Sequence, residues 1–217
     1  PADRPGTTRV DPGPDLTSRA TEVTNTVILP TTPLVQEFID LAGRVHYNNH
    51  RIVATDGRND PNVAAYDQQR NRCLNQNGGA GSWINYSPMK AGVASGAEAC
   101  YENGKIPPGG SRATFKPRGF VTGAGMARGH LIARELGGSG TDGRNVVALY
   151  QDKVNNSAMW HGTEQVVRQW VRSGDTVYYR VEPEFLNNDP LNHPVPTFVN
   201  IVAASKRGTV FIRIENV

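Results

Sequence analysis

The sequence predicts an α+β fold in which an antiparallel β-sheet packs against a few helices. Residues 176–185 are dense in β-branched and aromatic side chains, which favour strands. Residues 197–205 and 208–217 have the same character and are joined by a short Lys-Arg-Gly turn, which is typical of a β-hairpin. Helices are expected at 34–45 and 152–172, so strands and helices are both present and an all-α or all-β fold is disfavoured.

The N-terminal half predicts less regular structure. Residues 1–33 are rich in Pro, Thr, Asp and Gly, and we expect an extended arm or linker. Residues 34–45 carry apolar side chains at helical spacing, which indicates an amphipathic helix. Residues 46–110 are polar and contain many turn signals, which favours irregular loops. Because 217 residues can bury one sizeable core, we expect residues 34–217 to form a single domain.

Cys73 and Cys100 are the only cysteines of the chain. Both lie in a Gly-, Asn- and Ser-rich region that would cost much conformational entropy to order without a covalent link. Two buried free thiols are the alternative, whereas a structural zinc site would need more ligands. We expect a disulfide, and with it an oxidising compartment and a secreted protein. The chain contains no run of 18 apolar residues, so no membrane span is expected.

The segment that indicates chemistry begins near residue 112. We expect a strand over 113–121, a second over 125–133, a glycine-rich loop over 137–143, a short strand over 146–150 and a helix over 152–172. His130 lies where the second strand meets the loop, a position at which a rigid scaffold can present a catalytic residue. An imidazole with a near-neutral pKa can take a proton from attacking water. A hydrogen-bonded structural histidine is the alternative.

Three residues of the expected helix, Asn156, Trp160 and Glu164, are spaced i, i+4 and i+8, so they lie along one face. That face would present an amide oxygen and a carboxylate, which together with a histidine base suit metal-assisted attack on a phosphodiester. Asn155 is the competing metal ligand, and the spacing favours Asn156. Both asparagines could instead cap the helix. The alternative for Glu164 is an ordinary solvent-facing glutamate.

These patterns occur in a specific order. ARGHLIA at 127–133, RNVVALYQ at 144–151 and the Asn156-x3-Trp160-x3-Glu164 pattern together resemble the active site of the sugar-non-specific DNA/RNA endonuclease family. The resemblance implies an antiparallel sheet with a ββα-metal active-site motif at about 112–172. It covers about forty residues directly, and residues 1–110 match no family pattern.

The resemblance also implies roles for individual residues. His130 would be the general base and Asn156 the protein ligand of one Mg²⁺. Glu164 would accept hydrogen bonds from metal-bound water or hold a nearby arginine in place. Mn²⁺ is expected to substitute for Mg²⁺. Asn145 resembles a family position that supports the site by hydrogen bonding. One residue departs from the pattern, because Ala127 stands where the family usually has an acidic residue, and this leaves the orientation of His130 open.

Positive charge is concentrated around His130. The chain has a formal net charge of +3 and a pI of about 9.0, and residues 112–144 carry an excess of Arg and Lys over Asp and Glu. A polyanionic backbone would be attracted to this region, although a solvated charged face is the alternative. We expect Arg118, Arg134 and Arg144 to bind nucleic acid. Arg128 is expected to contact the scissile phosphate, the leaving group or an acidic residue that supports the site, and its guanidinium matches phosphate oxygens.

The sequence thus predicts a secreted, Mg²⁺-dependent endonuclease that hydrolyses phosphodiester bonds of DNA and RNA with little sequence preference. Products with 5′-phosphate and 3′-hydroxyl ends are implied by the resemblance. One alternative is the same nuclease as the toxic domain of a larger secreted toxin, with an immunity protein as partner and residues 1–33 as its former linker. The other alternative is a catalytically inactive nucleic-acid-binding module, which Ala127 suggests.

Overall fold

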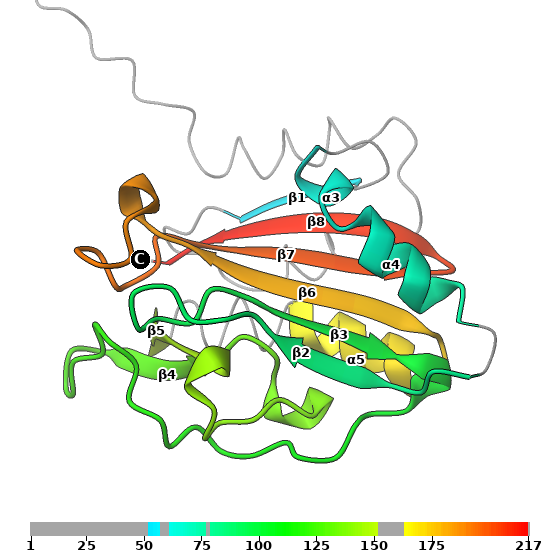
Figure 1. Ribbon diagram of the computed structural model, residues 1–217, viewed down its shortest axis with the longest axis horizontal. Helices are drawn as coiled ribbons and strands as arrows, with labels where there is room; N and C mark the ends of the chain where they lie inside the picture. Colours follow the sequence, from blue (N-terminus) through cyan, green and yellow to red (C-terminus); the bar gives the residue numbers. More distant parts are fainter. Residues whose placement is uncertain (1–51, 57–60, 77–78, 152–162, 217) are drawn as a thin grey trace, which may run out of the picture.

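The largest element of the protein is a six-stranded antiparallel sheet with strand order β1-β8-β7-β6-β3-β2 (Figure 1). The computed structural model describes residues 52–56, 61–76, 79–151 and 163–216. The strands of the large sheet are β1 (Ile52–Asp56), β2 (Trp83–Tyr86), β3 (Ala97–Tyr101), β6 (Val177–Glu184), β7 (Phe198–Ser205) and β8 (Gly208–Glu215). The strands expected over 176–185, 197–205 and 208–217 are confirmed, and Ser205 pairs with Gly208 at the end of the expected hairpin.

The two faces of this sheet are covered by different helices. Alternate residues of β6 point to opposite faces, so that Tyr179 joins the main hydrophobic core while Tyr178 joins a smaller one. The main core includes Trp170 of α5 (Gln165–Arg172). The smaller core includes Val63 of α3 (Pro61–Ala64) and Cys73 of α4 (Asp67–Leu74). The helix α5 is amphipathic, since its valines and Trp170 are buried while Gln169 and Arg172 are exposed.

A second antiparallel sheet consists of two strands, β4 (Met126–His130) and β5 (Val146–Tyr150). Gly129 leaves room for the side chain of Leu149 on the partner strand, since a Cβ atom at residue 129 would lie 2.4 Å from that side chain. Val147 and Leu149 of β5 share the main core with α5. The fold is therefore α+β, with two strands and a helix arranged as expected for a ββα unit.

Two regions differ from the expectation. Residues 113–121 do not form a strand, because Thr114 and Phe115 both donate their amide N–H to the carbonyl oxygen of Gly140, at 2.9 and 3.1 Å, and Pro117 has no N–H to donate. The region 46–110, expected to be irregular, contributes β1, β2, β3, α3 and α4. Strand β3 has the sequence AEACY, whose small residues give little strand signal although most of them are buried in the sheet.

The expected disulfide between Cys73 and Cys100 is confirmed, with an Sγ–Sγ distance of 2.02 Å. It joins α4 to β3, and both cysteines are fully buried. The arm expected over 1–33 and the helix expected over 34–45 lie outside the described residues. Among the helices that are described, none has the length and apolar character needed to cross a membrane.

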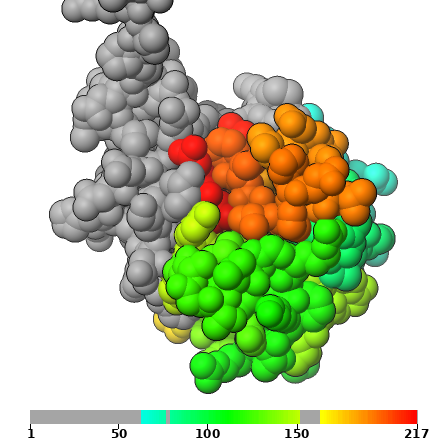
Figure 2. All heavy atoms as spheres, turned by 90° about the vertical axis from the view of Figure 1, so that its left-hand side faces the viewer, coloured from blue at the N-terminus to red at the C-terminus, as the bar shows by residue number. Residues whose placement is uncertain are grey.

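The long connection between β3 and β4 packs against the connection between β6 and β7. Figure 2 shows this contact as green atoms meeting orange atoms on one side of the molecule. The guanidinium of Arg118 donates hydrogen bonds to the carbonyl oxygens of Ala91 and of Leu191, the latter at 2.9 Å. Gly119 has a φ of 82°, and a Cβ atom there would lie 2.6 Å from Val195. This close approach fixes the connection on the surface near β4.

Candidate active site

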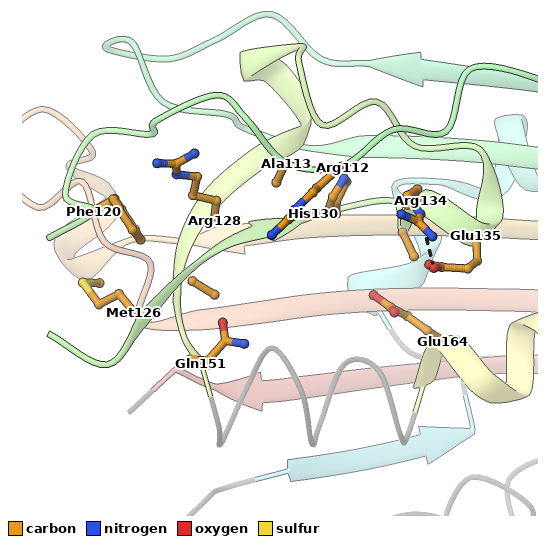
Figure 3. A pocket seen from close by; sticks show the side chains of 12 residues that line it. Arg112, Ala113, Phe120, Met126, Arg128, His130, Arg134, Glu135, Gln151 and Glu164 are labelled. Atoms are coloured by element: carbon orange, nitrogen blue, oxygen red, sulfur yellow. Dashed lines mark ion pairs between the residues drawn. The ribbon is translucent and has the colours of Figure 1, made fainter. Parts of the chain in front are cut away.

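Strand β4 presents alternate side chains to an open pocket of about 690 Å³. Met126, Arg128 and His130 lie on the same side of the strand, because successive side chains point to opposite faces. Figure 3 shows Phe120 and Met126 at one end of the pocket and Glu135 and Glu164 at the other, with Arg128 and His130 between them. The pocket therefore has an apolar end, a cationic and histidine-containing middle and an acidic end.

The imidazole of His130 is held by the backbone of the segment before β4. Its Nε2 atom lies 2.8 Å from the carbonyl oxygen of Ser111. Because a carbonyl oxygen can only accept, Nε2 carries the proton, and Nδ1 is then the basic nitrogen of the neutral ring. Burial lowers the pKa of His130 from its ordinary value of 6.5, and the contact with Ser111 and the charge of Glu135 partly oppose this. His130 is thus neutral and able to accept a proton at pH 7.

Asn145 fixes the chain that leaves β4. It is completely buried, and its Oδ1 atom accepts a hydrogen bond from the amide of Ile132 at 2.8 Å. Its Nδ2 atom donates to the carbonyl oxygens of Ile132 and Ser139, at 3.0 and 2.9 Å. The loop can pack against this side chain because residue 138 is glycine. A Cβ atom at this position would lie 1.7 Å from the carbonyl oxygen of Ile132. Asn145 therefore acts on the loop beyond His130 and does not itself line the pocket.

Glu164 is buried in the wall of the pocket and is only 5% exposed, which excludes the solvent-facing alternative. Burial raises the pKa of Glu164 to about 8, the charge of Glu135 raises it further, and Arg168 opposes the shift. Glu135 also lines the pocket and forms an ion pair of 3.5 Å with Arg134. The acidic end thus holds two carboxylates, of which one is too buried to keep a negative charge easily without a nearby cation.

Residues 112–203 match the family model of the DNA/RNA non-specific endonucleases. Over these residues the chain is similar to that family. The match includes β4, β5, α5, β6 and most of β7, and it confirms the resemblance seen in the sequence. The endonuclease is accordingly an enzyme that acts on nucleic acid. No curated protein matches the chain.

The fold is shared with the solved structures of NucA. NucA from Streptococcus agalactiae without metal is 22% identical, over 64% of this chain and 72% of that protein, with a TM-score of 0.50. The magnesium-bound structure of NucA is 23% identical, over 66% of this chain and 76% of that protein, with a TM-score of 0.50. A zinc-bound Sda1 nuclease is 16% identical over 78% of this chain and 85% of that protein, with a TM-score of 0.45.

The four arginines that the sequence suggested for the site divide into two groups. Arg128 and Arg134 are exposed and line the pocket. Arg128 donates to the carbonyl oxygen of Thr114 at 3.2 Å. The other two candidates for nucleic-acid binding, Arg118 and Arg144, do not line the pocket. Arg118 donates hydrogen bonds to two loop carbonyl groups. Arg144 forms an ion pair of 2.6 Å with Asp142.

Sequence reasoning missed several residues of the pocket, namely Phe120, Met126, Glu135 and Gln151. The position of Met126 could have been inferred from its alternation with Arg128 and His130, whereas Phe120 reaches the pocket through a loop. Asn156, its competitor Asn155 and Trp160 lie outside the described residues. Within the described part of the chain, no group of three or more His, Cys, Asp or Glu side chains could hold a metal ion.

Proposed function

We propose that the endonuclease hydrolyses phosphodiester bonds of DNA and RNA with His130 as its general base and one Mg²⁺ as its cofactor. One observation carries this proposal. His130 is a neutral imidazole, fixed through Nε2 by Ser111, in an open pocket that also presents arginines and carboxylates. A fixed base beside groups that can bind phosphate is the arrangement that hydrolysis of a phosphodiester requires.

In the proposed reaction Nδ1 of His130 takes a proton from a water molecule as the water oxygen forms a bond to phosphorus. The bond between phosphorus and the 3′ oxygen breaks, and the leaving oxygen takes up a proton from solvent water, which gives a 5′-phosphate and a 3′-hydroxyl end. Arg128 and Arg134 would bind phosphate oxygens, and Arg128 lies two residues before the base on the same side of β4. Binding through phosphates rather than base edges supports cleavage with little sequence preference.

We place the divalent cation at the acidic end of the pocket. Glu164 and Glu135 would supply hard oxygen atoms. Burial raises the pKa of Glu164, and a positive charge beside it would stabilise its ionised form. Asn156, which lies outside the described residues, is the proposed direct ligand, and Glu164 would accept hydrogen bonds from water bound to the ion. When bound, Mg²⁺ or Mn²⁺ would neutralise charge that develops on the phosphate and on the leaving oxygen. The magnesium-bound structure of NucA supports this choice.

Secretion is also proposed, since a buried disulfide is favoured in an oxidising compartment. The alternative of a toxin domain with an immunity protein as partner gains no support from the residues that the structure describes. The inactive binding module is disfavoured by the presence of His130 and Glu164 in one pocket.

The decisive experiment compares His130→Ala with the unmodified protein in a plasmid-nicking assay with Mg²⁺. We expect cleavage to fall by at least about 10²–10⁴-fold while the melting temperature stays within a few degrees, and imidazole should partly restore the rate. EDTA should abolish cleavage. Asn156→Ala should raise the Mg²⁺ concentration for half-maximal rate far more than Asn155→Ala does. Activity of His130→Ala within about threefold of the unmodified protein would overturn the assignment of the base.

A further inference from the structure

The apolar end of the pocket has no role in the reaction proposed above. It is formed by Phe120 and Met126, which come from different segments and line the same pocket as His130. Met126 is the first residue of β4, whereas Phe120 belongs to the connection between β3 and β4. Both side chains are partly exposed and therefore present apolar surface to whatever occupies the pocket. In the view of Figure 3 both lie at the end of the pocket away from Glu164.

The ring of Phe120 is held in place before any ligand binds. Its loop is fixed by the positive φ of the preceding Gly119 and by the close approach of that residue to Val195. The guanidinium carbon of Arg128 lies 5.3 Å from the centre of the Phe120 ring, within the range of a favourable cation–π contact. Arg128 is itself anchored by its hydrogen bond to Thr114. A pre-ordered aromatic side chain loses little entropy on binding.

The spacing along β4 relates this apolar end to the base. A strand rises about 3.3 Å per residue, so Arg128 is roughly 7 Å and Met126 roughly 13 Å from His130 along the strand. If a phosphate group is bound at His130, Arg128 would therefore lie near the oxygens of that phosphate or of the neighbouring phosphate. Met126 and Phe120 would lie beyond the bound phosphate. The part of a nucleic-acid strand that lies beyond the phosphate and offers a flat apolar surface is the base of an adjacent nucleotide.

We propose that Phe120 and Met126 form a stacking site for the base of a nucleotide flanking the cleaved bond. The proposal rests on the proposed function, since it places the cleaved bond at His130. Every base has a π-face, so stacking on an aromatic ring is tolerant of sequence, and the methionine thioether adds a favourable contact with a flat ring. A base inside a duplex is already stacked and paired. The site therefore favours unpaired or frayed nucleotides, and single strands should be cut more readily than duplexes of the same sequence.

The test maps cleavage along a 5′-labelled single-stranded DNA that carries one abasic nucleotide. The unmodified protein should cut the bond at one fixed offset from the abasic nucleotide about 5- to 100-fold more slowly than the same bond in the intact strand, which corresponds to the loss of one stacked base. In Phe120→Leu the intact strand should be cut more slowly, and the abasic position should no longer create a minimum. Phe120→Trp should keep the minimum.

Val121→Ala is the matched control, because Val121 is the neighbouring exposed side chain and does not line the pocket. It should keep both the rate and the minimum. Met126→Ala gives a second reading if Phe120→Leu does not fold, as judged by its melting temperature. A cleavage pattern that ignores the abasic nucleotide, or a minimum that persists in both Phe120→Leu and Met126→Ala, would overturn the stacking site. Failure of the unmodified protein to cut any strand would instead overturn the proposed function.

Discussion

The carboxamide of Asn145 pairs with both backbone groups of Ile132, accepting from its N–H at 2.8 Å and donating to its C=O at 3.0 Å. These two bonds imitate a β-bridge at the point where β4 has ended. They hold the chain two residues beyond His130 in a defined direction, although neither residue touches the open part of the pocket.

Asn145→Asp should therefore destabilise the protein and reduce cleavage. The new oxygen would face the carbonyl oxygens of Ile132 and Ser139, where Nδ2 now donates, and a buried mismatch of this kind costs roughly 2–4 kcal/mol. Urea unfolding and nicking rates measure the two effects. The control is Asn187→Asp at an exposed asparagine, which should change neither. An unaltered unfolding midpoint in Asn145→Asp would contradict the positioning role.

Glu164→Gln should alter how stability depends on pH in the metal-free protein. The folded state holds the proton of Glu164 up to a pKa of about 8, whereas the ordinary value is 4.5. Unfolding therefore releases a proton between these values, so stability is full below about pH 4.5 and falls as the pH rises towards 8. The Glu164→Gln variant should not lose stability in this way, because glutamine has no proton to release.

Melting temperatures measured in EDTA from pH 4.5 to 8.5 check this expectation. The difference in melting temperature between Glu164→Gln and the unmodified protein should grow with pH. At pH 8 it should correspond to a difference of up to a few kcal/mol in the free energy of unfolding. Glu135→Gln should show a smaller effect of the same sign, because Glu135 is the second cause of the raised pKa. Parallel curves for Glu164→Gln and the unmodified protein would show that Glu164 is ionised in the fold.

Arg134→Ala and Arg118→Ala should separate nucleic-acid binding from stability. Arg134 lines the pocket, so its loss should weaken binding about equally on unrelated sequences and flatten the slope of log affinity against log salt by roughly one. Arg118 links two loops through hydrogen bonds to carbonyl groups, so its loss should leave that slope unchanged and lower stability by about 1–2 kcal/mol. Binding to DNA in EDTA at several salt concentrations, with thermal melts, decides between these outcomes.

Tyr101 and Tyr179 form a matched pair of fully buried tyrosines in the main core. The hydroxyl of Tyr101 donates to the carbonyl oxygen of Leu136 at 2.9 Å, so Tyr101→Phe should cost about 1–3 kcal/mol. The hydroxyl of Tyr179 has no hydrogen-bond partner among the described residues, so Tyr179→Phe should be neutral or slightly stabilising. Equal losses of unfolding free energy in the two variants would show that Tyr179 has a partner in solution.

The sequence predicted the parts of the fold whose signals are local. Strands β6 to β8 and the terminal hairpin follow from dense β-branched residues and a short turn. Strand β3 could not be predicted in this way, because its alanines become strand-forming only when β6 and β2 pair with it on either side. The strand predicted at 113–121 does not form, because the amides of Thr114 and Phe115 donate hydrogen bonds to Gly140, which is remote in sequence.

Some residues of the candidate site could likewise be predicted from the sequence, and others could not. His130 and Glu164 lie in a continuous motif, and both reach the pocket. Glu135, which influences the pKa values of both of them, follows Arg134 in a turn where no spacing rule applies. The sequence also could not distinguish Arg118 from Arg134, because their charges are alike and only the folded loops show that the first is bound to carbonyl groups.

The order of the strands bears on when the protein can fold. Strand β1 pairs with β8, and β3 pairs with β6, so two strands near the start of the described chain find their partners only near its end. Such distant pairings must wait for the intervening chain and slow the search for the native state. The sheet cannot be completed until β8 is available to pair with both β1 and β7. The large sheet is therefore expected to form late in folding, and the nuclease would stay inactive until it has formed.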